Sequence, residues 1–190
     1  MQPIKSVPRR ITPPVLILVG VAALIGVALA VRAANRAASD APIADVKVSL
    51  SALARDHRDG PLTYPDQPPV GGVHNPAWIN CGIYKQQVAT ESAVHSLEHG
   101  AVWISYDPSL DERAVEALRE AVRDHPYTLL APARYGALNA PVVAVAWGTR
   151  LELPVATDPR LLRFIVRYAG GPQSPEPGAA CTGGIGTPNG

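Results

Sequence analysis

Apolar and polar positions divide the chain into one uncharged N-terminal run and a later part with short, alternating elements. The run from Ile11 to Val31 (ITPPVLILVGVAALIGVALAV) contains no charged residue. As an α-helix it would be about 31 Å long, which matches the roughly 30 Å hydrocarbon core of a bilayer. The pattern therefore predicts a transmembrane anchor at residues 11–31.

A second interpretation of this run stays open. Ala28-Leu29-Ala30 has the small-x-small pattern of a signal-peptide cleavage site, although the apolar run continues past it without a turn-forming residue. Both interpretations export the rest of the chain. Three basic residues precede the run and two follow it closely, so the positive-inside rule predicts a single-pass cell-membrane protein with a cytoplasmic N-terminus and an extracytoplasmic C-terminal domain.

After residue 31, the spacing of the hydrophobic residues alternates between the period of a helix and that of a strand. The expected elements are a helix at 91–99, a strand at 101–106, a helix at 109–125, strands at 127–131 and 141–147, and a helix at 158–169. Apolar spacing indicates the helices, and β-branched and aromatic content indicates the strands. The order strand, helix, strand, strand, helix predicts a small α+β fold.

Local signals predict where the helices begin and end. Gly100 is expected to end the first helix. Ser109, followed three residues later by Glu112, has the capping-box pattern at the start of the second. Asp158 and Pro159 are expected to start the last. The inward face of that last helix is expected to comprise Leu161, Leu162, Ile165, Val166 and Ala169.

The remaining segments are irregular by composition. Residues 60–76 are rich in proline and contain the pair Gly71-Gly72, which is typical of an extended, turn-rich segment. The expected organisation is a cytoplasmic N-terminus at 1–10, the anchor at 11–31, a stalk at 32–59, the extracytoplasmic domain at 60–182 and a flexible C-terminal tail at 183–190.

Charge narrows the range of partners. The formal net charge is +1 and the pI is 7.8, without the basic excess of a nucleic-acid-binding protein. Without the three basic residues that precede the run, the chain keeps 14 basic against 16 acidic residues, a net charge of −2. This excludes a polybasic lipid-binding surface. The expected partners are the membrane, through the anchor, and an envelope protein of unknown identity.

Cys81 and Cys181 are the only cysteines, and both lie in the exported part. Disulfides persist in oxidising compartments, so a bridge between the two is expected. It would tie the Gly/Pro-rich C-terminal segment to the segment before the first helix. A thiolate metal ligand at Cys81 and two free thiols are the alternatives.

The densest chemical pattern is His95-Ser96-Leu97-Glu98-His99. On a helix, His95 and His99 lie at i and i+4, with Cβ atoms about 5–6 Å apart. Together with His74 from the upstream loop they predict a three-nitrogen site for copper or zinc. Glu98 would be a further ligand or would orient an imidazole. Histidines that only stabilise the end of the helix are the alternative.

The same motif, H-x-x-E-H, occurs in inverzincin peptidases, where Glu98 would be the general base. The strand expected directly after Gly100 interrupts such a site, which favours a non-catalytic role. His57 and His125 have charged neighbours in the sequence and are expected to be solvated surface residues.

These motifs together resemble a bacterial family of membrane-anchored domains, common in actinobacteria, that is catalogued only as a numbered domain of unknown function. The similar pieces are His74, CGIY at 81–84, AVHSLEHGAVWISY at 93–106, AVAWG at 144–148, Phe164-Ile165 and the Pro-Glu pair at 175–176. The HSLEHG core is the specific part, and the resemblance covers residues 50–182. It implies a single N-terminal anchor and an extracytoplasmic domain, and no established activity.

The sequence thus predicts an anchored extracytoplasmic domain that binds copper or zinc through His74, His95 and His99, with Glu98 in support. Two alternatives remain. One is a non-catalytic interaction module of an envelope complex, in which the histidines are structural. The other is a minimal HxxEH metallohydrolase.

Overall fold

The computed structural model describes residues 24–30, 32, 42–48 and 53–190, and the chain divides into the units Met1–Pro42 and Ile43–Gly190. In the first unit, residues 24–30 are helical and exposed. Across the described residues, no helix has both the length and the apolar character needed to cross a membrane. Most of the predicted anchor, 11–23 and 31, lies outside the described residues.

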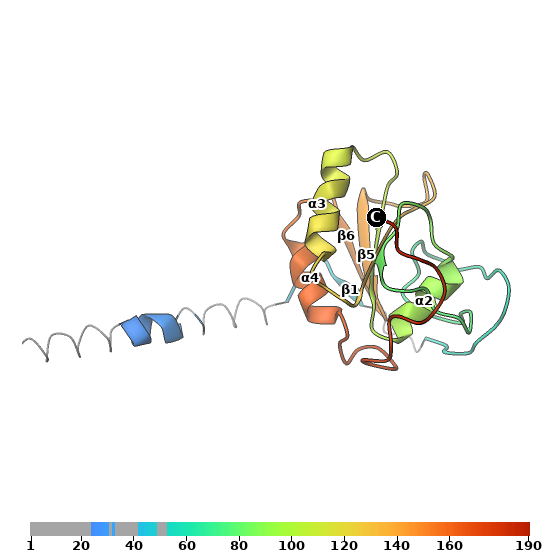
Figure 1. Cartoon of the computed structure of the whole chain (residues 1–190), viewed down its shortest axis with the longest axis horizontal. Coiled ribbons are helices and arrows are strands. Elements are labelled where there is room, and N and C mark those ends of the chain that lie inside the picture. Colours follow the sequence, from blue (N-terminus) through green and yellow to red (C-terminus); the bar gives the residue numbers. More distant parts are fainter. Residues whose placement is uncertain (1–23, 31, 33–41, 49–52) are drawn as a thin grey trace, which may run out of the picture. The chain divides into compact units, whose positions relative to one another are not determined.

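The second unit is built on a mixed sheet, in which the described residues form six strands in the order β1-β6-β5-β3-β4-β2 (Figure 1). The strands are β1 (Lys47–Val48), β2 (Gly82–Ile83), β3 (Val102–Tyr106), β4 (Thr128–Pro132), β5 (Val142–Ala146) and β6 (Thr149–Leu153). β3 pairs in parallel with β4 and antiparallel with β5, so Trp103 lies between Leu129 and Val145. The helix α3 (Glu112–Val122) provides the crossover that the parallel pair needs.

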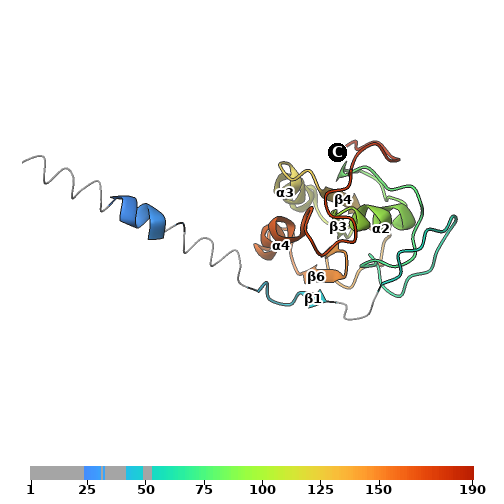
Figure 2. The ribbon, with the colours of Figure 1, turned by 90° about the horizontal axis from the view of Figure 1, so that it is seen from below.

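Helices cover both faces of the sheet, which explains why its central strands are buried and mostly apolar. α3 and α4 (Arg160–Tyr168) lie on one face, and α2 (Thr90–Glu98) lies on the other (Figures 1 and 2). Alternate residues of β3 point to the two sides: Ile104 belongs to the core under α3 and α4, and Trp103 to the core under α2. The predicted α+β class is therefore confirmed.

The strands expected at 101–106, 127–131 and 141–147 are present, but the sequence prediction missed β6. Its sequence, TRLEL, alternates polar and apolar residues, and only Trp147 and Gly148 separate it from β5. Gly148 has a φ of +71°, a left-handed conformation that glycine adopts without strain in a tight turn. The buried Arg150 on this strand donates hydrogen bonds to the carbonyl of Pro68 and to the carboxylate of Glu152.

The start of α3 differs from the predicted capping box. Asp111 is the N-cap, and its carboxylate accepts a 2.7 Å hydrogen bond from the amide of Ala114. Ser109 instead lies in the preceding turn, where its amide donates to the carboxylate of Asp107. The prediction of Ser109 as the cap was wrong because an aspartate two residues later caps equally well, and the turn at Asp107 uses the serine.

The buried face of α4 also differs from the prediction. Leu161, Phe164 and Ile165 are buried, whereas Leu162 and Val166 are 49% and 61% exposed. Each exposed residue directly follows a buried one, and one residue turns the helix by about 100°. Phe164 fills the core position that the prediction had left out.

Both irregular ends of the domain are attached to the sheet. Ile43 is buried and β1 pairs with β6, although both lie in the stretch predicted as a stalk. At the other end, Ile185 pairs with Ile79, and the amides of Asn189 and Gly190 donate to the carbonyl of Ile83. The stretch predicted as a flexible tail, 183–190, therefore takes part in the sheet edge.

Replacement of Gly100 by alanine is expected to destabilise the domain. Gly100 ends α2 with a φ of +100°, and an added Cβ would lie 3.0 Å from the Cα of Gly170, whose amide donates to the Gly100 carbonyl. The left-handed conformation alone costs about 1–2 kcal/mol for alanine, and the clash adds to it. Gly136→Ala is the matched control, because Gly136 has a φ of +71° and open space around it. Urea unfolding should give the larger loss for Gly100→Ala, and equal losses would contradict the proposed clash.

Candidate functional site

Three segments bring a group of histidines and one glutamate together beside α2. α2 contributes His95 and Glu98, and two irregular segments that precede β2 contribute His57 and His74. One possible ligand atom from each of these four residues lies within 4.8 Å of the others. We call these four residues the histidine cluster.

Backbone hydrogen bonds fix the segments that carry the cluster. His57 and His74 form a parallel bridge, in which the amide of Arg58 donates to the carbonyl of His74 over 2.7 Å. The His74 loop is held against α2 in turn, because the hydroxyl of Ser96 donates to the carbonyl of Ile79 over 2.7 Å. The positions of the rings thus follow from the path of the main chain.

The three most buried histidines share one hydrogen-bonding pattern. Their Nδ1 atoms each lie 2.7 Å from a backbone carbonyl oxygen: His74 on Gly72, His95 on Asn75 and His99 on Ala180. A carbonyl only accepts, so each Nδ1 carries the proton. In a neutral ring the lone pair is then on Nε2, and metal-ligating histidines are oriented in this way by their second nitrogen.

Glu98 completes the cluster. Its Oε2 lies 2.9 Å from the Nε2 of His74 and 3.6 Å from the Nε2 of His57. Because the Nδ1 proton of His74 is already donated to Gly72, a neutral His74 would direct a lone pair at a carboxylate. The close contact therefore requires a positive charge between the two groups, either a proton or a cation.

Burial sets the electrostatics of the cluster. His74 is fully buried, and His95 and Glu98 are 5% and 4% exposed, whereas the side chain of His57 is 47% exposed. Burial lowers the pKa of His95 below its ordinary value, and the neighbouring histidines lower it further, against the opposing effect of its hydrogen bond to Asn75. The neutral imidazole, which is the form that ligates metals, is thereby favoured.

Aromatic side chains enclose the cluster. The ring of His57 stacks on His95 at 4.8 Å, with an angle of 17° between the planes. The ring centroid of Trp78 lies 5.7 Å from that of His95, and the ring centroid of Trp147 lies 6.0 Å from that of His74. These rings exclude water on the inner side, so solvent reaches the cluster beside His57.

The structure brings together three of the four residues that the sequence singled out and separates the fourth. His74, His95 and Glu98 belong to the cluster, and His99 does not. The ring of His99 is 4.7 Å from that of His95, but its Nε2 faces Glu176 at 3.7 Å. α2 ends at Glu98, and the hydrogen bond to Ala180 turns the His99 ring toward the C-terminal segment.

His57 is the residue that sequence reasoning missed. Its charged neighbours indicated a solvated surface residue, and its side chain is indeed half exposed. What places it in the cluster is the bridge to His74, a contact between segments whose pairing no sequence pattern predicts. His125 lies outside the cluster.

The disulfide between Cys81 and Cys181 is present, with 5.4 Å between the two Cα atoms. This confirms the predicted bridge and excludes the two alternatives, a thiolate ligand at Cys81 and free thiols. The bridge holds the C-terminal segment against the end of α2, where the amide of Glu176 donates to the carbonyl of Glu98.

Comparison with known proteins identifies the family. A family model described as "Protein of unknown function (DUF3105)" matches residues 56–183, a range that includes the cluster and both cysteines. Comparisons with curated proteins and with solved structures found no match. Because the matched range spans well over half of the 190 residues, the chain belongs to the uncharacterised DUF3105 family.

Proposed function

We propose that the domain binds one transition-metal ion, zinc or copper(II), through His57, His74, His95 and Glu98. The contact between His74 and Glu98 carries the proposal, because two acceptor atoms 2.9 Å apart need a cation or a proton between them. Two further nitrogens converge on the same place. A metal ion satisfies all four groups at once.

The donor set narrows the choice of metal. Imidazole nitrogens and a carboxylate oxygen suit zinc and copper(II), whereas copper(I) is selected by the sulfur ligands that this cluster lacks. Four protein ligands correspond to a closed tetrahedral site, which holds a metal without presenting it to a substrate. The proposed role is therefore to store, buffer or pass on a metal ion, with the half-exposed His57 on the exchange route.

We place this activity outside the cytoplasm, in a protein held in the cell membrane by residues 11–31. The uncharged run in the sequence supports the anchor. The disulfide supports an oxidising compartment. Metal handling at the outer surface of the membrane follows from the two together.

The full chain, purified in mild detergent without a histidine tag, is expected to retain metal after loading. It would be incubated with zinc or copper(II), desalted and measured by mass spectrometry of its metal content. A roughly equimolar amount of either metal is the expected result, because the ligands are pre-arranged in the buried cluster.

A proton between His74 and Glu98 would satisfy the same contact without a metal. The domain would then be an interaction module of the envelope, with structural histidines. Only trace metal after both loadings would contradict metal binding and leave this second function.

A further inference from the structure

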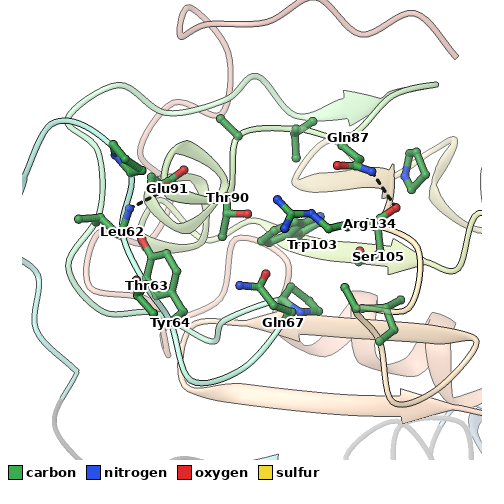
Figure 3. A pocket seen from close by; sticks show the side chains of 18 residues that line it. Leu62, Thr63, Tyr64, Gln67, Gln87, Thr90, Glu91, Trp103, Ser105 and Arg134 are labelled. Carbon is green, nitrogen blue, oxygen red and sulfur yellow. Dashed lines mark hydrogen bonds between the residues drawn. The ribbon is translucent and has the colours of Figure 1, made fainter.

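A cavity of about 500 Å³ opens at the N-terminal end of α2 (Figure 3). Its walls are the segment at 61–64, which we call the strap, the first residues of α2, Trp103 and Ser105 of β3, and the loop after β4. This volume is within the roughly 300–1,000 Å³ of small-molecule sites. The histidine cluster belongs to the opposite end of the helix, and none of its four residues lines the cavity.

Trp103 forms part of the cavity wall. The residue is 5% exposed, and its Nε1 is buried without a hydrogen-bond partner among the described residues. Because this atom has no accessible surface, a ligand in the cavity does not reach it. The indole ring lines the wall, so its N–H signal reports a ligand that binds there.

Two further features of the cavity favour negative charge. The N-terminus of α2 opens into it, and the N-cap residue, Ala89, has no side chain to cap the free amides. Arg134, from the loop after β4, is exposed and lines the same cavity. Together they offer two kinds of donor to one carboxylate.

A negative group also lines the cavity, in the first turn of α2. Glu91 lines the cavity, and its Oε1 accepts a 2.9 Å hydrogen bond from the amide of Leu62 in the strap. In Figure 3, Thr90 lies between Glu91 and Arg134. The cavity therefore presents one acidic and one basic side chain, with apolar lining from Val88 and Leu138.

We propose that this cavity binds a small zwitterion, a free amino acid or a short peptide. Its carboxylate would lie at Arg134 and the start of α2, and its ammonium group at Glu91. The apolar lining would accept the side chain. This site is independent of the metal proposal, because the two share no residue.

Indole NMR tests the proposal on the full chain in detergent. With ¹⁵N-labelled tryptophan the three tryptophans give three Nε1–H signals, and Trp103→Phe assigns the one from the cavity. Glutamate, leucine and dialanine are the probes. Acetate and ammonium, which each carry only one of the two charged groups, serve as half-probes. At least one zwitterion is expected to shift the Trp103 signal saturably at millimolar concentration, more strongly than either half-probe.

Matched variants separate the cavity from a general effect. Arg134→Ala and Glu91→Gln are each expected to weaken the titration about tenfold, since each removes one charge. Glu91→Gln keeps an acceptor for Leu62. Tyr135→Ala, at an exposed neighbour that does not line the cavity, is expected to leave the titration unchanged.

Metal loading keeps the two proposals distinguishable. It should shift the signals of Trp78 and Trp147, which contact the histidine cluster, and not that of Trp103. The zwitterion proposal is overturned if no probe shifts the Trp103 signal saturably, or if Arg134→Ala leaves the titration as in the wild type.

Discussion

Replacement of His95 by alanine is expected to weaken zinc or copper(II) binding by more than about 100-fold. Loss of a residue that merely orients a ligand typically costs 10–100-fold in metal affinity, and loss of a ligand should cost more. His95 is buried, its Nδ1 is held by the carbonyl of Asn75, and it is one of the four proposed ligands. Competition with a chromophoric chelator measures the affinity.

His99→Ala is the sharpest control for this prediction. His95 lies in α2 and His99 is the residue that caps its C-terminus. Both have similar burial and an Nδ1 bonded to a carbonyl, but His99 faces Glu176 outside the cluster. It is expected to leave the affinity within a few-fold of the wild type. Equal losses for the two variants would contradict the assigned ligand set and favour the site predicted from sequence.

His57→Ala is expected to affect the rate of metal exchange more than the metal affinity. The side chain of His57 is 47% exposed, so its loss leaves three buried ligands in place and opens the site to solvent. Metal dissociation into excess chelator is expected to become faster, with a smaller loss of affinity than for His95→Ala. Glu98→Gln, which keeps the size and removes the charge, should resemble His95→Ala.

Loss of the disulfide is expected to cause the largest drop in stability. Cys81 and Cys181 are 100 residues apart in the sequence. Closing a loop of that length lowers the entropy of the unfolded chain. This raises the free energy of unfolding by up to about 4.7 kcal/mol. The double variant Cys81→Ser, Cys181→Ser should therefore unfold at markedly lower urea concentration than the oxidised wild type.

The reduced wild type is the natural control, since it has the same sequence without the bridge. It should unfold like the double serine variant, and its intact mass should rise by the two hydrogens of the thiols. Unchanged unfolding in reductant, with the mass shift present, would show that the bridge contributes little. The expected local effect is release of the segment that contacts His99 through Ala180 and Glu98 through Glu176.

The central part of the fold could be predicted from sequence because its strands are buried on both faces. β3, β4 and β5 consist of nearly continuous β-branched and apolar residues, and this pattern has few alternatives. β6 could not be found in the same way, because Arg150 and Glu152 resemble a solvated loop until their contacts to the 67–68 turn and to each other are known. The two-residue strands β1 and β2 carry no periodic signal at all.

The same division holds for the candidate site. The spacing of His95 and Glu98 follows from one helix and was visible in the motif. His74 was correctly associated with them because it is near in sequence. His57 required the pairing of two irregular segments, and the orientation of His99 required the C-terminal segment that the disulfide returns to α2.

The backbone carbonyls that hold the histidine rings make the cluster resistant to point mutation around it. A substitution at position 75 changes a side chain but cannot delete the carbonyl oxygen that holds His95. Gly72, whose carbonyl holds His74, is the exception, because its φ of +116° is one that other residues rarely adopt. Related chains can thus vary at position 75 and still present the same Nε2 atom of His95, provided the backbone follows the same path. A search for this site elsewhere should therefore match the carbonyl positions together with the imidazoles, and not the neighbouring residue types.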